Sequence, residues 1–341
     1  MLSVKGTVDS RDKLANHLHK PASNPNEAII VGCVAYADSI ASIWEGMRQY
    51  FITVGVAFDF VMFTTYDRQV EALVNGSIDI AWNGPLAHVR VQKRTGGQSV
   101  SLGMRDVDRG FSTNLVVRAD AGIKDVAGLA GKKLAVGTYD SPQACVLPLQ
   151  ALAAVDGGAL LKQIHVTRFD RDLGKHGDTA AGELEVIRAL VEGEVDAGFV
   201  SGVMFDRAVG AGDVNAGSRN RLEVVPGACR PFDHCQFDAM PTLSEEKRLA
   251  FSTALFAMDW GDADQRRVMQ QEGIRAKWET PREEGYAAMR DALANEEAVP
   301  FPPPHDTPEQ HRFASLEVRT KAGFPATEFV RSCAAVPANK A

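Results

Sequence analysis

One stretch decides the fold: residues 132 to 148, with the sequence KKLAVGTYDSPQACVLP. Leu134 to Val136 is a short apolar run with basic residues before it and turn residues after it, which predicts a strand. Ser141 and Pro142 then open an alanine- and leucine-rich helical segment, with Ser141 as the N-cap and Pro142 as the first helical residue. A helix start offers free backbone N–H groups to a small anion, although the same pattern also fits an ordinary capped helix.

The composition describes a globular protein large enough for two domains. The chain has 341 residues, of which 45% are hydrophobic and 24% are charged. Its formal net charge of -7 argues against nucleic acid or an anionic membrane surface as the main partner. Five cysteines, an odd and scattered set, suit a reducing compartment better than a disulfide framework.

The N-terminal residues favour a cytoplasmic location. Residues 1 to 13, MLSVKGTVDSRDK, lack the unbroken apolar core of a secretory signal. No later window of the sequence is apolar and long enough to span a membrane, so we expect no membrane insertion. Removal of a signal peptide from the chain would instead make the protein periplasmic.

Strands and helices are predicted to alternate along most of the chain. The apolar runs that predict strands are residues 28–35, 58–63, 78–82, 113–117, 134–136, 195–200 and 222–225. Amphipathic helical segments lie between many of them. This alternation implies mostly parallel sheets, with functional sites at the carboxyl ends of the strands.

Three motifs occur in order along this pattern: GSIDIAWNGPLA at 76–87, GLAGKKLAVG at 128–137 and VEGEVDAG at 191–198. Together they resemble the phosphate/phosphonate-type substrate-binding proteins of ABC transporters, which have the type 2 periplasmic-binding-protein fold. The resemblance covers residues 28 to 295, approximately. It implies two α/β lobes, each a mostly parallel sheet flanked by helices, with a small ligand in the cleft between the lobes.

The resemblance also implies the domain boundaries. Lobe one is expected to comprise residues 28–112 and 231–300, and lobe two residues 113–230. Residues 1–27 are polar and are predicted to form an N-terminal extension. Residues 301–341 are predicted to be a tail packed on the lobes, or a contact between two copies in a homodimer, because the proline-rich start of this region excludes regular helix.

The family holds its anion with a Ser-Thr-Ser-Gly type turn, and this chain matches it only in part. The matching run begins Ser141-Pro142-Gln143, with Pro148 in register, so one hydroxyl remains. Phosphonate oxygens need several donors in a desolvated cleft. A carboxylate or a neutral polar heterocycle would suit Ser141, Gln143 and the helix start better.

Aromatic and amide side chains next to predicted strands complete the candidate ligand site. Tyr36 and Trp82 are placed to stack on a planar ligand, but aromatic residues in such positions are as often part of the core. Asn83 follows Trp82 directly, and Tyr139 stands in the loop before Ser141. We therefore expect these four residues to contact the ligand.

Histidine, cysteine and aspartate residues form a candidate metal site. The resemblance implies that His176 matches a ligand-contacting histidine and Asp233 a ligand-contacting aspartate, whereas the following His234 and Cys235 are new. With Cys33, they offer the ligand types of zinc, cobalt and related divalent ions. On a strand, His234 would face away from Asp233 and Cys235, so the three cannot all be ligands without a bulge. The preferred set is therefore His176 with two of Asp233, His234 and Cys235. Alternatively, His176 only hydrogen-bonds the ligand and Cys33 is a buried hydrophobe.

Two functions are consistent with these features. The preferred one is a cytoplasmic metal-dependent lyase or hydrolase acting on a small planar carboxylate or heterocycle, for example the desulfhydrase of a thioxoimidazolidine acid. In it His176 is catalytic, and Asp140 or Asp178 acts as general base. The alternative is a substrate-binding protein that delivers phosphonate, phosphite or another small anion to an ABC permease.

Overall fold

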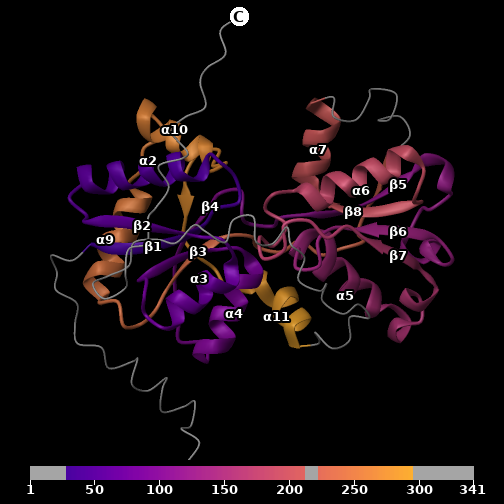
Figure 1. The fold of residues 1–341 in the computed structure, drawn as a ribbon, viewed down its shortest axis with the longest axis horizontal. Helices are drawn as coiled ribbons and strands as arrows, with labels where there is room; N and C mark the ends of the chain where they lie inside the picture. The colour runs from indigo at the N-terminus through magenta and orange to yellow at the C-terminus, as the bar shows by residue number, and fades with distance from the viewer. Residues whose placement is uncertain (1–27, 212–221, 295–341) are drawn as a thin grey trace, which may run out of the picture.

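The computed structural model describes residues 28–211 and 222–294, which form two α/β lobes side by side (Figure 1). The predicted two-lobed α/β architecture is confirmed. The first sheet draws on residues 29–105 and 236–279, and the second on residues 113–225. The predicted N-terminal extension, 1–27, and C-terminal tail, 301–341, lie outside the described residues, and the lobe boundaries stay a prediction.

The sheet of lobe one is mixed. Its strand order is β11-β4-β10-β3-β1-β2. The strands are β1 (Ile29–Val34), β2 (Phe58–Phe63), β3 (Ile80–Asn83), β4 (Val100–Arg105), β10 (Gln236–Ala239) and β11 (Trp278–Glu279). β1 pairs in parallel with β2 and β3, whereas β10 lies antiparallel between β3 and β4. The sheet is therefore not mostly parallel, because β10 returns from the other lobe in the opposite direction.

An aromatic core fills one face of this sheet. The helices of lobe one are α2 (Ile40–Thr53), α3 (Tyr66–Val74), α4 (Pro85–Thr95), α9 (Glu245–Phe256), α10 (Ala263–Gln271) and α11 (Ala287–Ala294). The ring of Phe51 on α2 stacks on Phe58 and on Phe251 of α9, with centroid distances of 4.7 Å and 5.1 Å. Phe237 lies at the centre, edge-on to Trp44 and Phe251. The helical spacing of the apolar residues in α2 thus places its buried stripe on the sheet.

Lobe two has a second mixed sheet, of order β7-β6-β8-β5-β9. Its elements are β5 (Thr113–Arg118), β6 (Lys133–Val136), α5 (Leu147–Ala153), β7 (His165–Arg168), α6 (Ala181–Glu192), β8 (Ala197–Ser201), α7 (Gly202–Ala211) and β9 (Leu222–Val225). As predicted, Ser141 caps the helix after β6, since its hydroxyl accepts from the Ala144 N–H at 3.3 Å. The first turn, Pro142–Val146, has π geometry and is followed by α5.

Two chain segments cross between the lobes and pair with each other. The Phe232 N–H donates to the Phe111 carbonyl at 3.1 Å, and the His234 N–H donates to the Asp108 carbonyl at 2.8 Å. Helix α11 lies between the lobes near α4 and α5 (Figure 1). Its Leu293 shares an apolar cluster with Leu86 of α4 and Leu147 of α5. The lobes are therefore joined by a paired crossing and by a shared helix.

The aromatic core predicts which truncations destabilise lobe one. Phe237→Ala removes a fully buried ring and should lower the free energy of unfolding by about 3–5 kcal/mol, the usual cost of such a cavity. Leu249→Ala, on the exposed side of α9, should change it by about 0.5 kcal/mol or less. Urea unfolding monitored by tryptophan fluorescence measures both. Equal losses in the two variants would contradict this assignment of the core.

Candidate functional site

A loop of lobe two, residues 173–178, lies directly against lobe one. The Gly174 carbonyl accepts from the Tyr66 N–H at 2.9 Å, and the Lys175 ammonium donates to the Ala35 carbonyl. The ring of His176 stacks on Tyr66 with a centroid distance of 4.5 Å and an interplanar angle of 14°. This loop therefore closes one side of the space between the carboxyl end of β1 and the start of α3.

The same loop packs closely on the turn before α5. His176 and Gly177 both adopt positive φ, at 52° and 83°. A Cβ at Gly177 would lie 2.4 Å from the Ser141 hydroxyl oxygen and 3.0 Å from the Gln143 amide nitrogen. Residue 177 must therefore be glycine both for its conformation and for this approach. The contact brings predicted residues Ser141, Gln143 and His176 into one region.

Two carboxyl groups of this region hold protons unusually well. Burial raises the pKa of Asp178 to about 7, although the Tyr66 hydroxyl donates to it at 2.5 Å and opposes the shift. Burial likewise raises the pKa of Asp140 to about 6, against the hydrogen bond from the Gly174 N–H. Both groups can therefore exchange protons near neutral pH, and their role as general bases stays a prediction.

Burial also lowers the pKa values of the two basic side chains of the loop. Burial and the nearby Arg90 guanidinium hold the pKa of His176 well below its usual value. Burial also lowers the pKa of Lys175 to about 8. His176 is thus neutral at pH 7. Since Arg90 Nη1, 3.4 Å away, can only donate to His176 Nε2, the ring proton resides on Nδ1.

Three buried polar atoms of these two segments have no hydrogen-bond partner: Asp140 Oδ1, Gln143 Oε1 and His176 Nδ1. The amide orientation of Gln143 is fixed, because its Nε2 donates to Glu183 Oε1 at 3.1 Å. Glu183 in turn accepts from the backbone and side chain of Ser201. Buried polar groups are normally paired, so this set indicates a site for a polar ligand.

A second cluster lies in lobe one, where the crossing segments meet. Asp108, His234 and Cys235 are buried, and one ligand atom from each lies within 4.8 Å of the others. The three side chains could hold a metal ion. The predicted alternation of 233–235 does not apply, because β10 begins only at Gln236. The side chains of His234 and Cys235 therefore approach each other, with Nδ1 and Sγ 2.9 Å apart.

The other predicted metal ligands lie apart from this cluster. Asp233 accepts from the Gly110 N–H at 3.0 Å and forms a two-point ion pair with Arg282, away from the three clustered side chains. Cys33 lies in the core of lobe one and contacts the Val61 carbonyl at 3.6 Å. His176 faces Arg90, a cation. Only His234 and Cys235 of the five predicted ligands belong to the cluster.

Two of the predicted ligand-binding residues lie inside lobe one. Trp82 is 4% exposed and packs on Phe237 at 4.5 Å, with Arg105 over its ring. Asn83 is fully buried and donates to Asp238 at 2.8 Å. The structure therefore accounts for both through packing and hydrogen bonds within the lobe.

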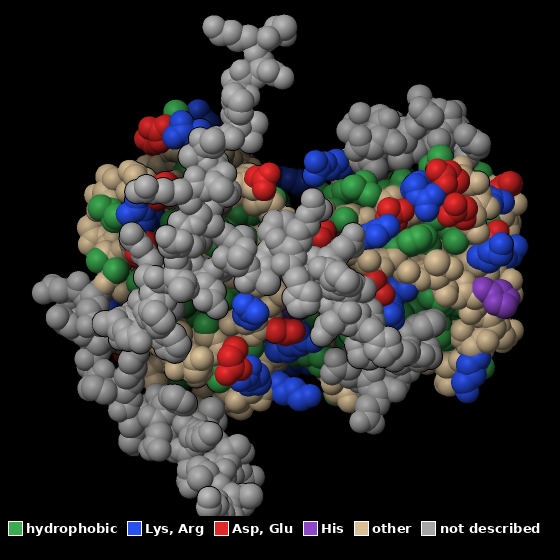
Figure 2. Space-filling view, in the orientation of Figure 1, with side chains coloured by type: hydrophobic (Ala, Val, Ile, Leu, Met, Phe, Trp, Pro, Cys, Tyr) green, Lys and Arg blue, Asp and Glu red, His purple; other side chains and the backbone are tan. Residues whose placement is uncertain are grey.

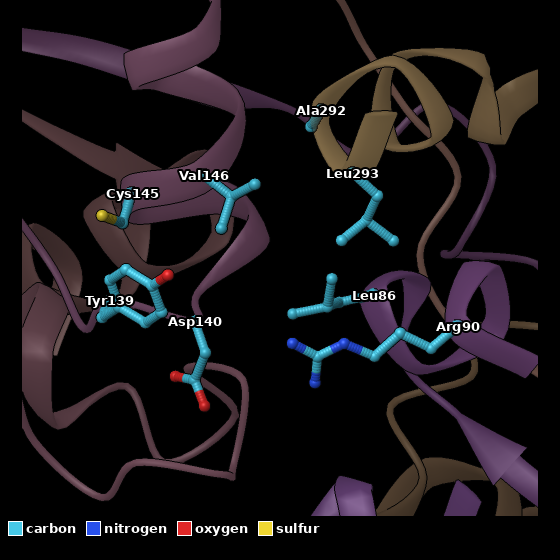
Figure 3. A pocket seen from close by; sticks show the side chains of 8 residues that line it. All are labelled: Leu86, Arg90, Tyr139, Asp140, Cys145, Val146, Ala292 and Leu293. Atoms are coloured by element: carbon cyan, nitrogen blue, oxygen red, sulfur yellow. The ribbon is translucent and has the colours of Figure 1, made fainter. Parts of the chain in front are cut away.

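The remaining aromatic candidates lie nearer the interface. Tyr36 follows β1 and lies near charges of both lobes, since burial and the Glu272 and Asp178 carboxyls raise its pKa. Tyr139 stacks under Arg168 at 5.2 Å and lines a small cavity of about 30 Å³. Figure 3 shows this cavity between Asp140 and the helices that carry Arg90 and Leu293. A space of this size holds roughly one water molecule.

The sequence did not single out Tyr66, Arg105 or Asp108. Arg105, the last residue of β4, and Asp108 form a two-point ion pair at 2.7 Å and 2.8 Å. A signal for them was present, because polar residues after the last strand before a crossing are placed to reach the interface. Tyr66 begins an amphipathic helix, and nothing in the sequence separates such a tyrosine from a core residue.

Residues 35–286 match the family described as ABC transporter, phosphonate, periplasmic substrate-binding protein. This match covers well over half of the chain, and the chain belongs to that family. The predicted resemblance and the type 2 periplasmic-binding-protein fold are thereby confirmed.

Solved structures support the same fold. PhnD1 from Prochlorococcus marinus, in complex with methylphosphonate, is 15% identical with a TM-score of 0.59, over 81% of this chain and 100% of that chain. A binding protein component of an ABC phosphonate transporter from Pseudomonas aeruginosa is 14% identical with a TM-score of 0.55, over 80% and 87%. The periplasmic aliphatic sulphonate binding protein SsuA from Escherichia coli is 20% identical with a TM-score of 0.53, over 81% and 94%.

On the face shown in Figure 2, acidic and basic side chains are interspersed among the coloured residues. Across residues 28–211 and 222–294, the structure contains no helix that is both long and apolar enough to cross a membrane.

Asp178 predicts a pH dependence of stability. Its pKa is about 7 in the folded protein against an ordinary 3.8, so the folded state binds a proton that the unfolded state has released. Wild-type stability should therefore fall as the pH rises from about 4 to about 7. Asp178→Asn cannot ionise, yet still accepts from Tyr66. The free energy of unfolding of this variant should therefore lack this fall with pH. At pH 8 it should exceed the wild-type value by about 1–2 kcal/mol.

Urea unfolding at several pH values between 5 and 8 measures this difference. Asp172→Asn, an exposed change in the same region, is the matched control and should keep the wild-type slope. If Asp178→Asn also keeps the wild-type slope, Asp178 does not hold its proton in the folded state.

Proposed function

We propose that this protein is a substrate-binding protein that captures a small polar ligand between its lobes. The observation that carries the proposal is the set of unpartnered atoms on Asp140, Gln143 and His176, next to the loop that contacts Tyr66. Membership in a family of periplasmic substrate-binding proteins supports it independently. Delivery to an ABC permease, and with it a periplasmic location, is part of this proposal.

The hydrogen-bonding character of these atoms defines the class of ligand. The oxygens of Asp140 and Gln143 accept hydrogen bonds, whereas Nδ1–H of His176 donates one. The nearby cations already have partners: Arg90 pairs with Asp67 at 2.5 Å, and Lys175 donates to the Ala35 carbonyl. A fully ionised phosphonate would face two acceptors and would need more donors. We therefore infer a ligand that carries its own N–H or O–H donors, such as a neutral heterocycle.

Ligand binding can be tested with a small panel of solutes. Hydantoin, a neutral cyclic ureide, should raise the melting temperature of the purified full-length protein more than methylphosphonate, ethanesulfonate or glutarate at equal concentration. The reason is that hydantoin supplies both N–H donors and carbonyl acceptors. Stronger binding of methylphosphonate would support the binding function but contradict the ligand class. If no solute of the panel binds, the proposal fails.

A substitution links binding to the cleft. Asp140→Asn keeps an oxygen for the Gly174 N–H but replaces a charged acceptor by an amide. It should raise the Kd of the best panel solute by about 10- to 100-fold, since hydrogen bonds to charged groups contribute roughly 1.5–3 kcal/mol. Asp120→Asn, exposed on lobe two, should leave the Kd unchanged. Titration calorimetry measures both, and equal Kd values would place the ligand elsewhere.

The second candidate function is a cytoplasmic metal-dependent lyase or hydrolase, for example a desulfhydrase of a thioxoimidazolidine acid. The specific observation in its favour is the buried cluster of Asp108, His234 and Cys235. Asp178 and Asp140, whose raised pKa values suit proton transfer, would serve as its general bases. Sulfide release from a thioxoimidazolidine acid in the presence of Zn²⁺ or Co²⁺ would support this function over simple binding, and its absence would favour binding.

A further inference from the structure

The cluster of Asp108, His234 and Cys235 is built by two segments held together by backbone. The His234 N–H donates to the Asp108 carbonyl at 2.8 Å, and the Tyr286 hydroxyl donates to the His234 carbonyl at 3.0 Å. The ring of His234 also packs on Phe111, with a centroid distance of 4.5 Å. The imidazole is therefore fixed in position by the crossing rather than held on a mobile surface loop.

Two partners approach the same nitrogen of His234. Cys235 Sγ lies 2.9 Å from Nδ1, and Asp108 Oδ1 lies 3.7 Å from the same atom. In a nucleophilic cysteine site the thiol and the orienting carboxylate bind opposite nitrogens of the imidazole. Convergence on one nitrogen is instead the arrangement of ligands around a common ion.

The separations also fit a small divalent ion. Zinc bonds of about 2.3 Å to sulfur and about 2.0–2.1 Å to nitrogen or oxygen, at tetrahedral angles, place neighbouring ligand atoms roughly 3.3–3.6 Å apart. The observed 2.9 Å and 3.7 Å lie on either side of this range. Small rotations of the side chains would therefore be enough to bind the ion.

The charges around the cluster also favour an added cation. Arg105 pairs with Asp108 through two hydrogen bonds and lies 3.7 Å from Glu272, whose Oε2 accepts no hydrogen bond. Two carboxyl groups thus face one guanidinium in a buried region. The carboxylates of Asp108 and Glu272 with the Arg105 guanidinium leave one net negative charge. A divalent ion bound together with the Cys235 thiolate would add one net positive charge and balance it. Arg105 would meanwhile orient the Asp108 ligand, as outer partners of metal ligands commonly do.

We propose that Asp108, His234 and Cys235 form a binding site for a divalent metal ion of the zinc type. One sulfur, one nitrogen and one oxygen ligand suit zinc or cobalt better than magnesium or calcium, which prefer oxygen alone. Three protein ligands leave a fourth coordination position open.

Cobalt absorption tests this site directly. The full-length protein, treated with a chelator and dialysed, is titrated with Co²⁺ and then with Zn²⁺. We expect one equivalent of Co²⁺ to produce a near-ultraviolet thiolate-to-cobalt charge-transfer band, and Zn²⁺ to abolish it by competition. Cys235→Ala should lose the band and bind Zn²⁺ at least about 100-fold more weakly, since the loss of a direct ligand exceeds that of an outer partner. Absence of a band in wild type would overturn the proposal.

Two further variants make the result specific. Cys145→Ala, a change at a buried cysteine of lobe two, should keep the band and the wild-type affinity; loss of the band in this variant alone would overturn the assignment. Cys235→Ser preserves side-chain size if alanine prevents folding, and circular dichroism checks that each variant is folded. A folded Cys235→Ser variant with the wild-type band would also overturn the proposal. The readout needs no cleft ligand, so it is independent of the binding function.

Discussion

Tyr66 stacks on His176 and donates to Asp178, and this contact holds lobe two against lobe one. Its cost is electrostatic, because closing the lobes takes the Asp178 carboxyl out of water and raises its pKa. The contact therefore couples the relative position of the lobes to the protonation of Asp178. The packing of the neighbouring turn depends on this contact, since the loop that carries His176 also packs Gly177 against the turn at Ser141.

Much of the fold could be predicted from sequence because it rests on local signals. The apolar run at Leu134–Val136, the cap at Ser141 and the helical spacing of Trp44, Met47 and Phe51 each act within a few residues. The strand directions could not be read in this way. β10 lies between β3 and β4, and its reversed direction depends on a return from the other lobe.

The candidate sites were predicted less completely, for the same physical reason. Asp108 and His234 are 126 positions apart by their numbers and meet only because two crossings pair. Trp82 stands at a strand end, as a stacking residue would, yet its ring packs on Phe237. Asp233 matches the family pattern, yet it pairs with Arg282, far along the chain, and lies outside the cluster of Asp108, His234 and Cys235. Residue type and order identify candidates, whereas tertiary partners decide which remain available.

Helix α11 bears on how quickly a ligand could enter or leave. Leu293 of this helix shares one apolar cluster with Leu86 of lobe one and Leu147 of lobe two. Any rotation that separates α4 from α5 exposes part of this cluster to water, at a free-energy cost of about 25 cal/mol for each Å² of apolar surface. That cost is the same whichever solute is bound. Exchange kinetics would thus depend on this apolar cluster at the border of the cleft, where Leu86 and Leu293 line a cavity beside Asp140, and substitutions there would change the residence time of the ligand.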